Sequence, residues 1–166
     1  TATIAPTPVT ALLHAVAVVK AGVFGVMRIT YFSFGTALIS GTWAQWLPLG
    51  VAVFTIVFGS AMALRERHFK RRLAYSTVSN LSYVLFGVLL LTPEGFTAGL
   101  MHMVFHALMK LTLFCCVGAI LEKTGREYVG QLHGLARRMP FVYAVYALAA
   151  IALVGVPPLP GFQSKW

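Results

Sequence analysis

The chain has 166 residues, of which 58% are hydrophobic and only 10% charged, and its mean hydropathy is +0.81. Soluble domains carry about 25% charged residues, so this composition excludes an ordinary soluble domain and indicates a membrane protein. A formal charge of +9 would suit nucleic-acid binding, but the basic residues cluster in short segments between apolar runs. That clustering is the orientation signal of membrane proteins, so we expect a lipid bilayer around the chain and no nucleic-acid partner.

Apolar runs of about 20 residues, the length that crosses the hydrocarbon core as a helix, recur along the chain. We predict an all-α fold, a polytopic membrane helix bundle forming a single domain, with spans at about residues 9–31, 47–64, 73–92, 97–121 and 140–161. The connection 32–46 carries Trp43 and Trp46 as interface anchors, and residues 93–96 are predicted to form a tight turn. Because the sequence begins without Met and stops just after a broken apolar segment, we expect a fragment of a longer protein.

The basic residues predict the orientation of these spans. The loop 65–72 has five Lys or Arg among eight residues, and the loop 122–139 is also basic. If the spans cross alternately, both loops lie on one face of the membrane. The connections 32–46 and 93–96 then lie on the other face, and Glu94 is the only charged residue in them. The positive-inside rule then places both basic loops in the cytoplasm.

The fourth predicted span, GLMHMVFHALMKLTLFCCVGAIL, is apolar but carries His102, His106 and Lys110. Their i, i+4, i+8 spacing places them on one side of a helix, about 6 Å apart along its axis. An ionisable group in lipid costs at least about 2.5–3.5 kcal/mol, so all three are expected to face the bundle interior or a hydrated cavity. Two imidazoles and an amine in series can each take and pass a proton, which predicts part of a proton path.

Two further ionisable residues lie in the first predicted span. Lys20 is about 16–18 Å deep, near the middle of the bilayer, where its side chain hardly reaches an interface. We therefore interpret Lys20 as functional rather than as an anchor. His14 lies six residues earlier, about 120° away around the helix, so the two cannot share one narrow face of a regular helix.

The last predicted span is interrupted by the sequence VPPLPGF. Pro157, Pro158 and Pro160 remove backbone donors, so the helix is expected to open between Val156 and Phe162. Broken helices at membrane depth are tolerated where they are buried or line a wet cavity, and they mark ion sites in transporters. Lys165 follows directly, and an ordinary exit loop with an interfacial lysine remains the alternative.

Two other uses of these residues compete with a proton path. A His-x3-His pair on a helix can bind zinc, but no acidic or thiolate ligand lies nearby on this helix, and Cys115 and Cys116 are interpreted as packing residues. One haem cannot be held by two histidines on the same side of one helix, although His14 could pair with His102 or His106. A haem-binding electron-transfer membrane protein is therefore the alternative from another class.

Four stretches in fixed order resemble the proton-conducting antiporter-like membrane subunits. They are APTPVTALLHAVAVVKAGVF, KRRLAYSTVSNLSYVLFG, HMVFHALMK and GVPPLPGFQSK. This family includes the large proton-pumping subunits of respiratory complex I, the large subunits of Mrp-type cation/proton antiporters, and their equivalents in membrane-bound hydrogenases. The resemblance implies a fourteen-helix fold with two inverted five-helix repeats. This chain would extend from the eighth helix to the first half of the broken twelfth.

By that resemblance, the candidate proton-translocation residues fall on three helices of the family. His14 and Lys20 lie on the eighth helix, His102, His106 and Lys110 on the eleventh, and Lys165 at the break of the twelfth.

The implied function is proton translocation by one subunit of a larger complex, redox-driven or antiporter, in a bacterial or archaeal membrane. Lys20 would pass charge toward the histidines, and Lys165 would release the proton outside. Sodium/proton antiport is the alternative within the family. The glutamate and lysine of the family's first half-channel are not in this sequence, so the chain is not expected to pump alone. No cofactor is expected, and any redox reaction belongs to partner subunits.

Overall fold

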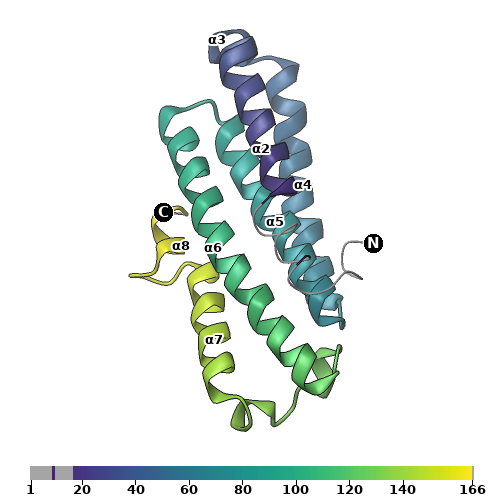
Figure 1. Cartoon of the computed structure of the whole chain (residues 1–166). Coiled ribbons are helices and arrows are strands. Elements are labelled where there is room, and N and C mark those ends of the chain that lie inside the picture. The colour runs from purple at the N-terminus through teal and green to yellow at the C-terminus, as the bar shows by residue number, and fades with distance from the viewer. Residues whose placement is uncertain (1–8, 10–16, 166) are drawn as a thin grey trace.

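The computed structural model of the chain describes residue 9 and residues 17–165, and this part is built from helices (Figure 1). Its elements, in chain order, are α2 (Val18–Arg28), the π-helical η2 (Ile29–Phe34), α3 (Thr36–Ile39), α4 (Trp43–Arg65), α5 (Phe69–Leu89), α6 (Pro93–Thr124), the 3₁₀ turns η3 (Val129–Gln131) and η4 (Leu135–Arg137), α7 (Pro140–Val154) and α8 (Pro160–Gln163). The predicted all-α fold is confirmed.

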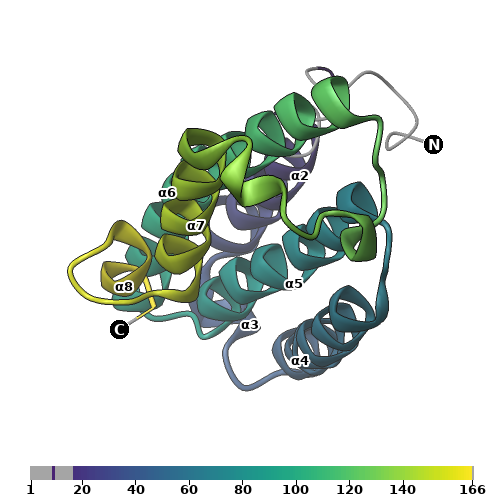
Figure 2. The ribbon, with the colours of Figure 1, turned by 90° about the horizontal axis from the view of Figure 1, so that it is seen from below.

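Consecutive long helices are neighbours in space. α4 packs along α5, α5 along α6, and α6 along α7, while α2 contacts α5 (Figures 1 and 2). α8 lies beside the middle of α6, because the chain turns after α7 instead of continuing along it (Figure 1). The middle of α6 therefore faces α5 on one side and the α7–α8 junction on another.

Two apolar clusters hold the bundle together. One joins α5, α6 and α7 through Phe69, Leu113, Phe114 and their neighbours. The other joins α2 and α5 through buried residues that include Met27 and Val84. Burying a large apolar side chain contributes about 1.5–3 kcal/mol, so these clusters fix the relative positions of the helices that carry the ionisable residues.

The exposed surface is strongly apolar. α4 exposes large side chains such as Trp43 and Phe54, and α6 exposes Val104 and Leu108 on the side opposite its buried histidines. Two helices in the described part, α4 and α6, are long and apolar enough to cross a membrane, and α7 is a shorter apolar helix. Charged side chains inside and apolar side chains outside are the pattern expected of helices surrounded by lipid or by other membrane helices.

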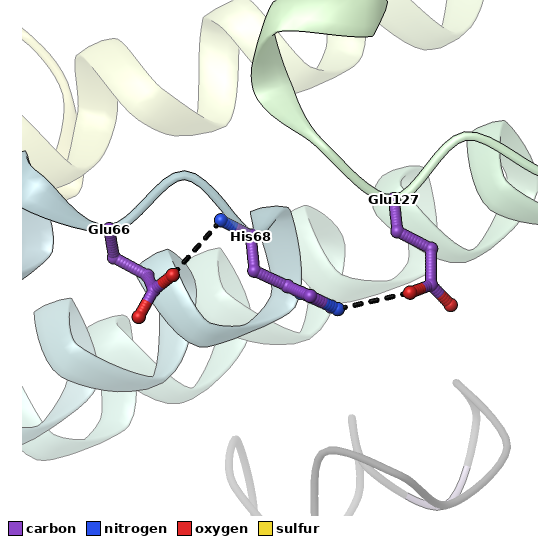
Figure 3. A network of polar contacts seen from close by, with 3 residues as sticks. All are labelled: Glu66, His68 and Glu127. Atoms are coloured by element: carbon purple, nitrogen blue, oxygen red, sulfur yellow. Dashed lines mark hydrogen bonds and ion pairs between the residues drawn. The ribbon is translucent and has the colours of Figure 1, made fainter.

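The two basic loops contact each other through polar groups (Figure 3). His68, between α4 and α5, pairs its Nε2 with Glu127 Oε2 at 3.1 Å, and its backbone N–H donates to Glu66 Oε1 at 3.1 Å. Backbone bonds from Phe69 N to Glu127 O and from Val129 N to Arg67 O complete a small antiparallel bridge between the loops. The sequence placed both loops on one face, and the structure brings them into direct contact.

Some helix ends differ from the sequence prediction. Residues 93–96, expected to be a turn, form the first turn of α6, because the Thr92 hydroxyl accepts a bond from Gly95 N and proline suits the first helical position. α4 already begins at Trp43, within the predicted connection 32–46. α7 ends at Val154, before the expected opening, because Gly155 adopts a left-handed conformation (φ 95°) that stops the helix ahead of the prolines.

Candidate functional site

The three ionisable residues of α6 point into the bundle. His102 is 3% exposed, and His106 and Lys110 are both 0% exposed, whereas Val104 and Leu108 on the other side of the helix are 55% and 60% exposed. Their helical spacing explains this arrangement, because residues four apart lie on one face. Lys110 is among the largest fully buried side chains in the described part of the chain.

Lys110 is bound to α5. Its Nζ donates to the carbonyl oxygen of Leu73 at 3.1 Å and to the hydroxyl of Ser76. Ser76 also lines a cavity of about 400 Å³ between α4, α5, α6 and α7, together with polar residues that include Asn80 and Arg72. The buried amine therefore has oxygen partners on its neighbouring helix, and one of them, Ser76, borders a cavity with both apolar and polar lining residues.

His102 is bound to the segment after α8. Its Nδ1 lies 2.9 Å from the hydroxyl oxygen of Ser164. Its ring stacks against the ring of His106, with centroids 5.9 Å apart and planes at 24°. Both ring nitrogens of His106, and Nε2 of His102, are buried without a hydrogen-bond partner among the described residues.

Lys165 bonds to the C-terminal end of α7, just before the break in the last predicted span. Its Nζ donates to the carbonyl oxygen of Leu153 at 2.8 Å and lies 3.5 Å from that of Val154, so it satisfies carbonyls at the C-terminus of α7. Its Nζ also lies 5.9 Å from the centre of the Tyr83 ring. The side chain is exposed in this chain.

A second cavity, of about 390 Å³, lies next to both His102 and Lys165. It lies between α5, α6 and the segment after α8, and its lining includes Tyr83, Gly99, His102, Ser164 and Lys165. His102 and Lys165 therefore open onto one space, although they are far apart in sequence.

Lys20 lies on α2 and is 8% exposed. Its Nζ is buried and has no hydrogen-bond partner in the part of the chain that the structure describes. His14, the other predicted residue of this span, lies outside the described residues.

Two contacting residues were missed as site residues. Ser76 belongs to the stretch LAYSTVSNLSY, which carries several hydroxyl and amide side chains within a predicted span. Ser164 stands next to Lys165 and carried no signal of its own. A buried lysine needs a polar partner, so the polar residues within the neighbouring apolar segment were the signal that could have indicated Ser76.

The comparisons with known proteins agree with this architecture. A family model described as NADH:quinone oxidoreductase/Mrp antiporter, TM, matches residues 1–166. The chain belongs to this family. The resemblance identified from the sequence is confirmed, and membership in a transmembrane family places the chain in a membrane.

Named relatives of this antiporter-like chain come from several kinds of complex. It is 33% identical to NADH-quinone oxidoreductase subunit N of Parvibaculum lavamentivorans over 98% of the chain and 33% of that protein. It is 35% identical to an Na(+)/H(+) antiporter subunit of Alkalihalophilus pseudofirmus over 97% of the chain and 21% of that protein.

Two solved structures share the fold of the chain. The Mrp complex from a Dietzia species matches with a TM-score of 0.85 and 36% identity over 98% of the chain and 18% of the matched chain. The membrane-bound sulfane sulfur reductase, an archaeal respiratory membrane complex, matches with a TM-score of 0.86 and 32% identity over 99% of the chain and 33% of the matched chain. The antiporter-like chain thus spans a third or less of the length of these relatives.

Proposed function

We propose that the chain is part of a proton-translocating membrane subunit of a complex I-like, hydrogenase-type or Mrp-type antiporter complex. The observation that carries this proposal is the burial of His102, His106 and Lys110 on the inner face of an otherwise apolar helix. A helix gains no stability from such groups in lipid, where each costs at least about 2.5–3.5 kcal/mol, so their placement favours a role in moving charge.

The proposed route uses the residues predicted from the sequence. Lys20 on α2 passes charge toward the α6 residues, and Lys165 holds and releases the proton at the broken helix; His14 belongs to the first part of the route. The burial of Lys20 on α2, and the cavity shared by His102 and Lys165, support this order. Amines and imidazoles suit the task because both protonation states are accessible to them.

The partners follow from the relatives. Their names include subunits of NADH-quinone oxidoreductase and of an Na(+)/H(+) antiporter, so we propose that this chain works among other membrane subunits in a bacterial or archaeal cell membrane. Redox centres, where the complex has any, belong to those partners. Exchange of sodium for protons is tested together with proton translocation below.

The test uses the full-length subunit within its complex, reconstituted in proteoliposomes with a pH-sensitive dye inside. Substrate-driven acidification or alkalinisation that persists when choline replaces sodium supports proton translocation. A strict requirement for sodium on the opposite side would instead establish sodium/proton antiport. A Soret band that depends on His102 or His106 in the purified complex would overturn both in favour of a haem protein.

A further inference from the structure

A direct hydrogen bond, between His102 and Ser164, joins the buried histidines to the broken-helix segment. Ser164 is itself buried, at 9% exposure, and immediately precedes Lys165. The two neighbours face different partners, since Ser164 contacts α6 while Lys165 reaches the end of α7. Ser164 is therefore placed to connect the histidine pair to the lysine at the break.

The hydroxyl of Ser164 has two competing uses. Its oxygen lies 2.9 Å from His102 Nδ1 and 3.3 Å from the carbonyl oxygen of Gly161. When Nδ1 carries a hydrogen, it donates to the hydroxyl oxygen, and the hydroxyl hydrogen is free to bond Gly161. When Nδ1 is bare, the hydroxyl donates to it instead, and the Gly161 carbonyl loses that bond.

The turn that Ser164 closes has little room to adjust. Gly161 packs directly on α7, so that a Cβ at this position would overlap the carbonyl oxygen of Ala152. Gly155 lies against the same glycine, and the Lys165 side chain is in contact range of Gly155. The turn that contains Gly161 and Ser164 is therefore packed closely against the end of α7, which Lys165 contacts.

We propose that Ser164 is a positioning residue that couples the protonation of His102 Nδ1 to the placement of Lys165 at the broken helix. This inference rests on the proposed function, because it assumes that His102 gains and loses protons. The Ser164 hydroxyl keeps its one hydrogen throughout. Only its role toward His102 Nδ1 changes, from hydrogen-bond acceptor to donor and back. Among the described residues, the ionisable groups that face His102 include His106 on α6, and Tyr83 on α5 and Lys165 after α8, which line the same cavity.

The experiment compares variants of the full-length subunit within its assembled complex. Ser164→Ala removes the hydroxyl, Ser164→Thr keeps one, and Ser82→Ala is the matched control. Ser82 is a serine at 6% exposure whose hydroxyl bonds only Val78 within its own helix α5 among the interactions described. Proton translocation in proteoliposomes is measured for each, together with the ¹⁵N resonance of His102 Nδ1 in histidine-labelled complex, assigned by its loss in His102→Gln.

We expect Ser164→Ala to lower the rate of proton translocation roughly fivefold, the effect of losing one ordinary hydrogen bond, and to shift the His102 Nδ1 resonance. Ser164→Thr should recover most of the rate, and Ser82→Ala should match the wild type. Wild-type translocation by Ser164→Ala, an equal loss in Ser82→Ala, no recovery with threonine, or an unchanged Nδ1 resonance would each overturn the proposal.

Two safeguards keep the test decisive. If Ser164→Ala does not assemble, Ser164→Cys replaces it, since a thiol of similar size is a much weaker hydrogen-bonding group, and the same outcomes apply. If the wild-type complex moves no protons, the proposed function fails, whereas the Nδ1 resonance still shows whether Ser164 controls His102. Failure of the coupling and failure of the function therefore give different results.

Discussion

Replacing Lys110 by methionine tests the candidate site most directly. Methionine nearly fills the volume of the lysine side chain but cannot bind or release a proton. Volume-conserving changes in a packed interior usually cost less than about 1.5 kcal/mol, whereas Lys110→Ala would leave a cavity and cost about 2–5 kcal/mol. The methionine variant therefore removes the protonatable amine without leaving a cavity, so its effect on proton translocation can be distinguished from an effect of lost packing.

The surroundings of Lys110 set the structural cost of this change. Its two hydrogen bonds from a charged donor are worth about 1.5–3 kcal/mol each, but removing the amine also removes the cost of burying a charge. The carbonyl oxygen of Leu73 is not left without a partner, since the hydroxyls of Ser76 and Thr77 both donate to it at 2.9 Å. We therefore expect a net destabilisation on the order of 1–2 kcal/mol and normal assembly.

The assay measures assembly on a native gel and proton translocation in proteoliposomes. Lys110→Met should assemble and translocate protons only at background, and Lys110→Ala should lose translocation in the same way wherever it assembles. Lys123→Met is the matched control, because Lys123 lies on the same helix α6 but is exposed near its end. Wild-type translocation by an assembled Lys110→Met complex would refute the role of Lys110.

Three further results are expected. Cysteines in Glu66→Cys and Arg126→Cys should react with an impermeant reagent from the same side of the membrane, since their loops are in contact, and labelling from opposite sides would contradict this topology. Lys165→Arg should assemble but translocate protons slowly, because guanidinium keeps its proton; a full rate would reduce Lys165 to an anchor. Gly161→Ala should lower the melting temperature of the complex, because the added Cβ overlaps the Ala152 carbonyl oxygen, and an unchanged melting temperature would show that the junction of α7 and α8 can yield.

The part of the site on α6 was predictable because it depends on one helix alone. His102, His106 and Lys110 share a face of any regular helix, and the cost of exposing them to lipid determines which way that face points. Their burial follows from these two facts without knowledge of the neighbouring helices. The family was predictable for a related reason, because its motifs combine such residues with prolines in a fixed order.

The partners of these residues were not predictable from spacing. Ser164 lies 62 residues from His102, and Ser76 lies 34 residues from Lys110, so both contacts depend on how separate helices pack. The exact ends of helices depend on short capping interactions, such as the Thr92 hydroxyl on Gly95 N and the left-handed Gly155. Prolines indicated a break in the last span, but the glycine ahead of them stops the helix.

The α6 residues differ in how they are held, and this difference bears on how a proton would pass among them. Lys110 is bound to α5 and His102 to Ser164, so the two outer members are anchored to different elements. His106 lies between them, fully buried, and neither of its nitrogens has a hydrogen-bond partner among the described residues. It touches His102 by ring stacking, which transfers no proton. Passage through His106 therefore requires its ring to turn or water to enter, whereas the two outer members are already held by hydrogen bonds to neighbouring elements.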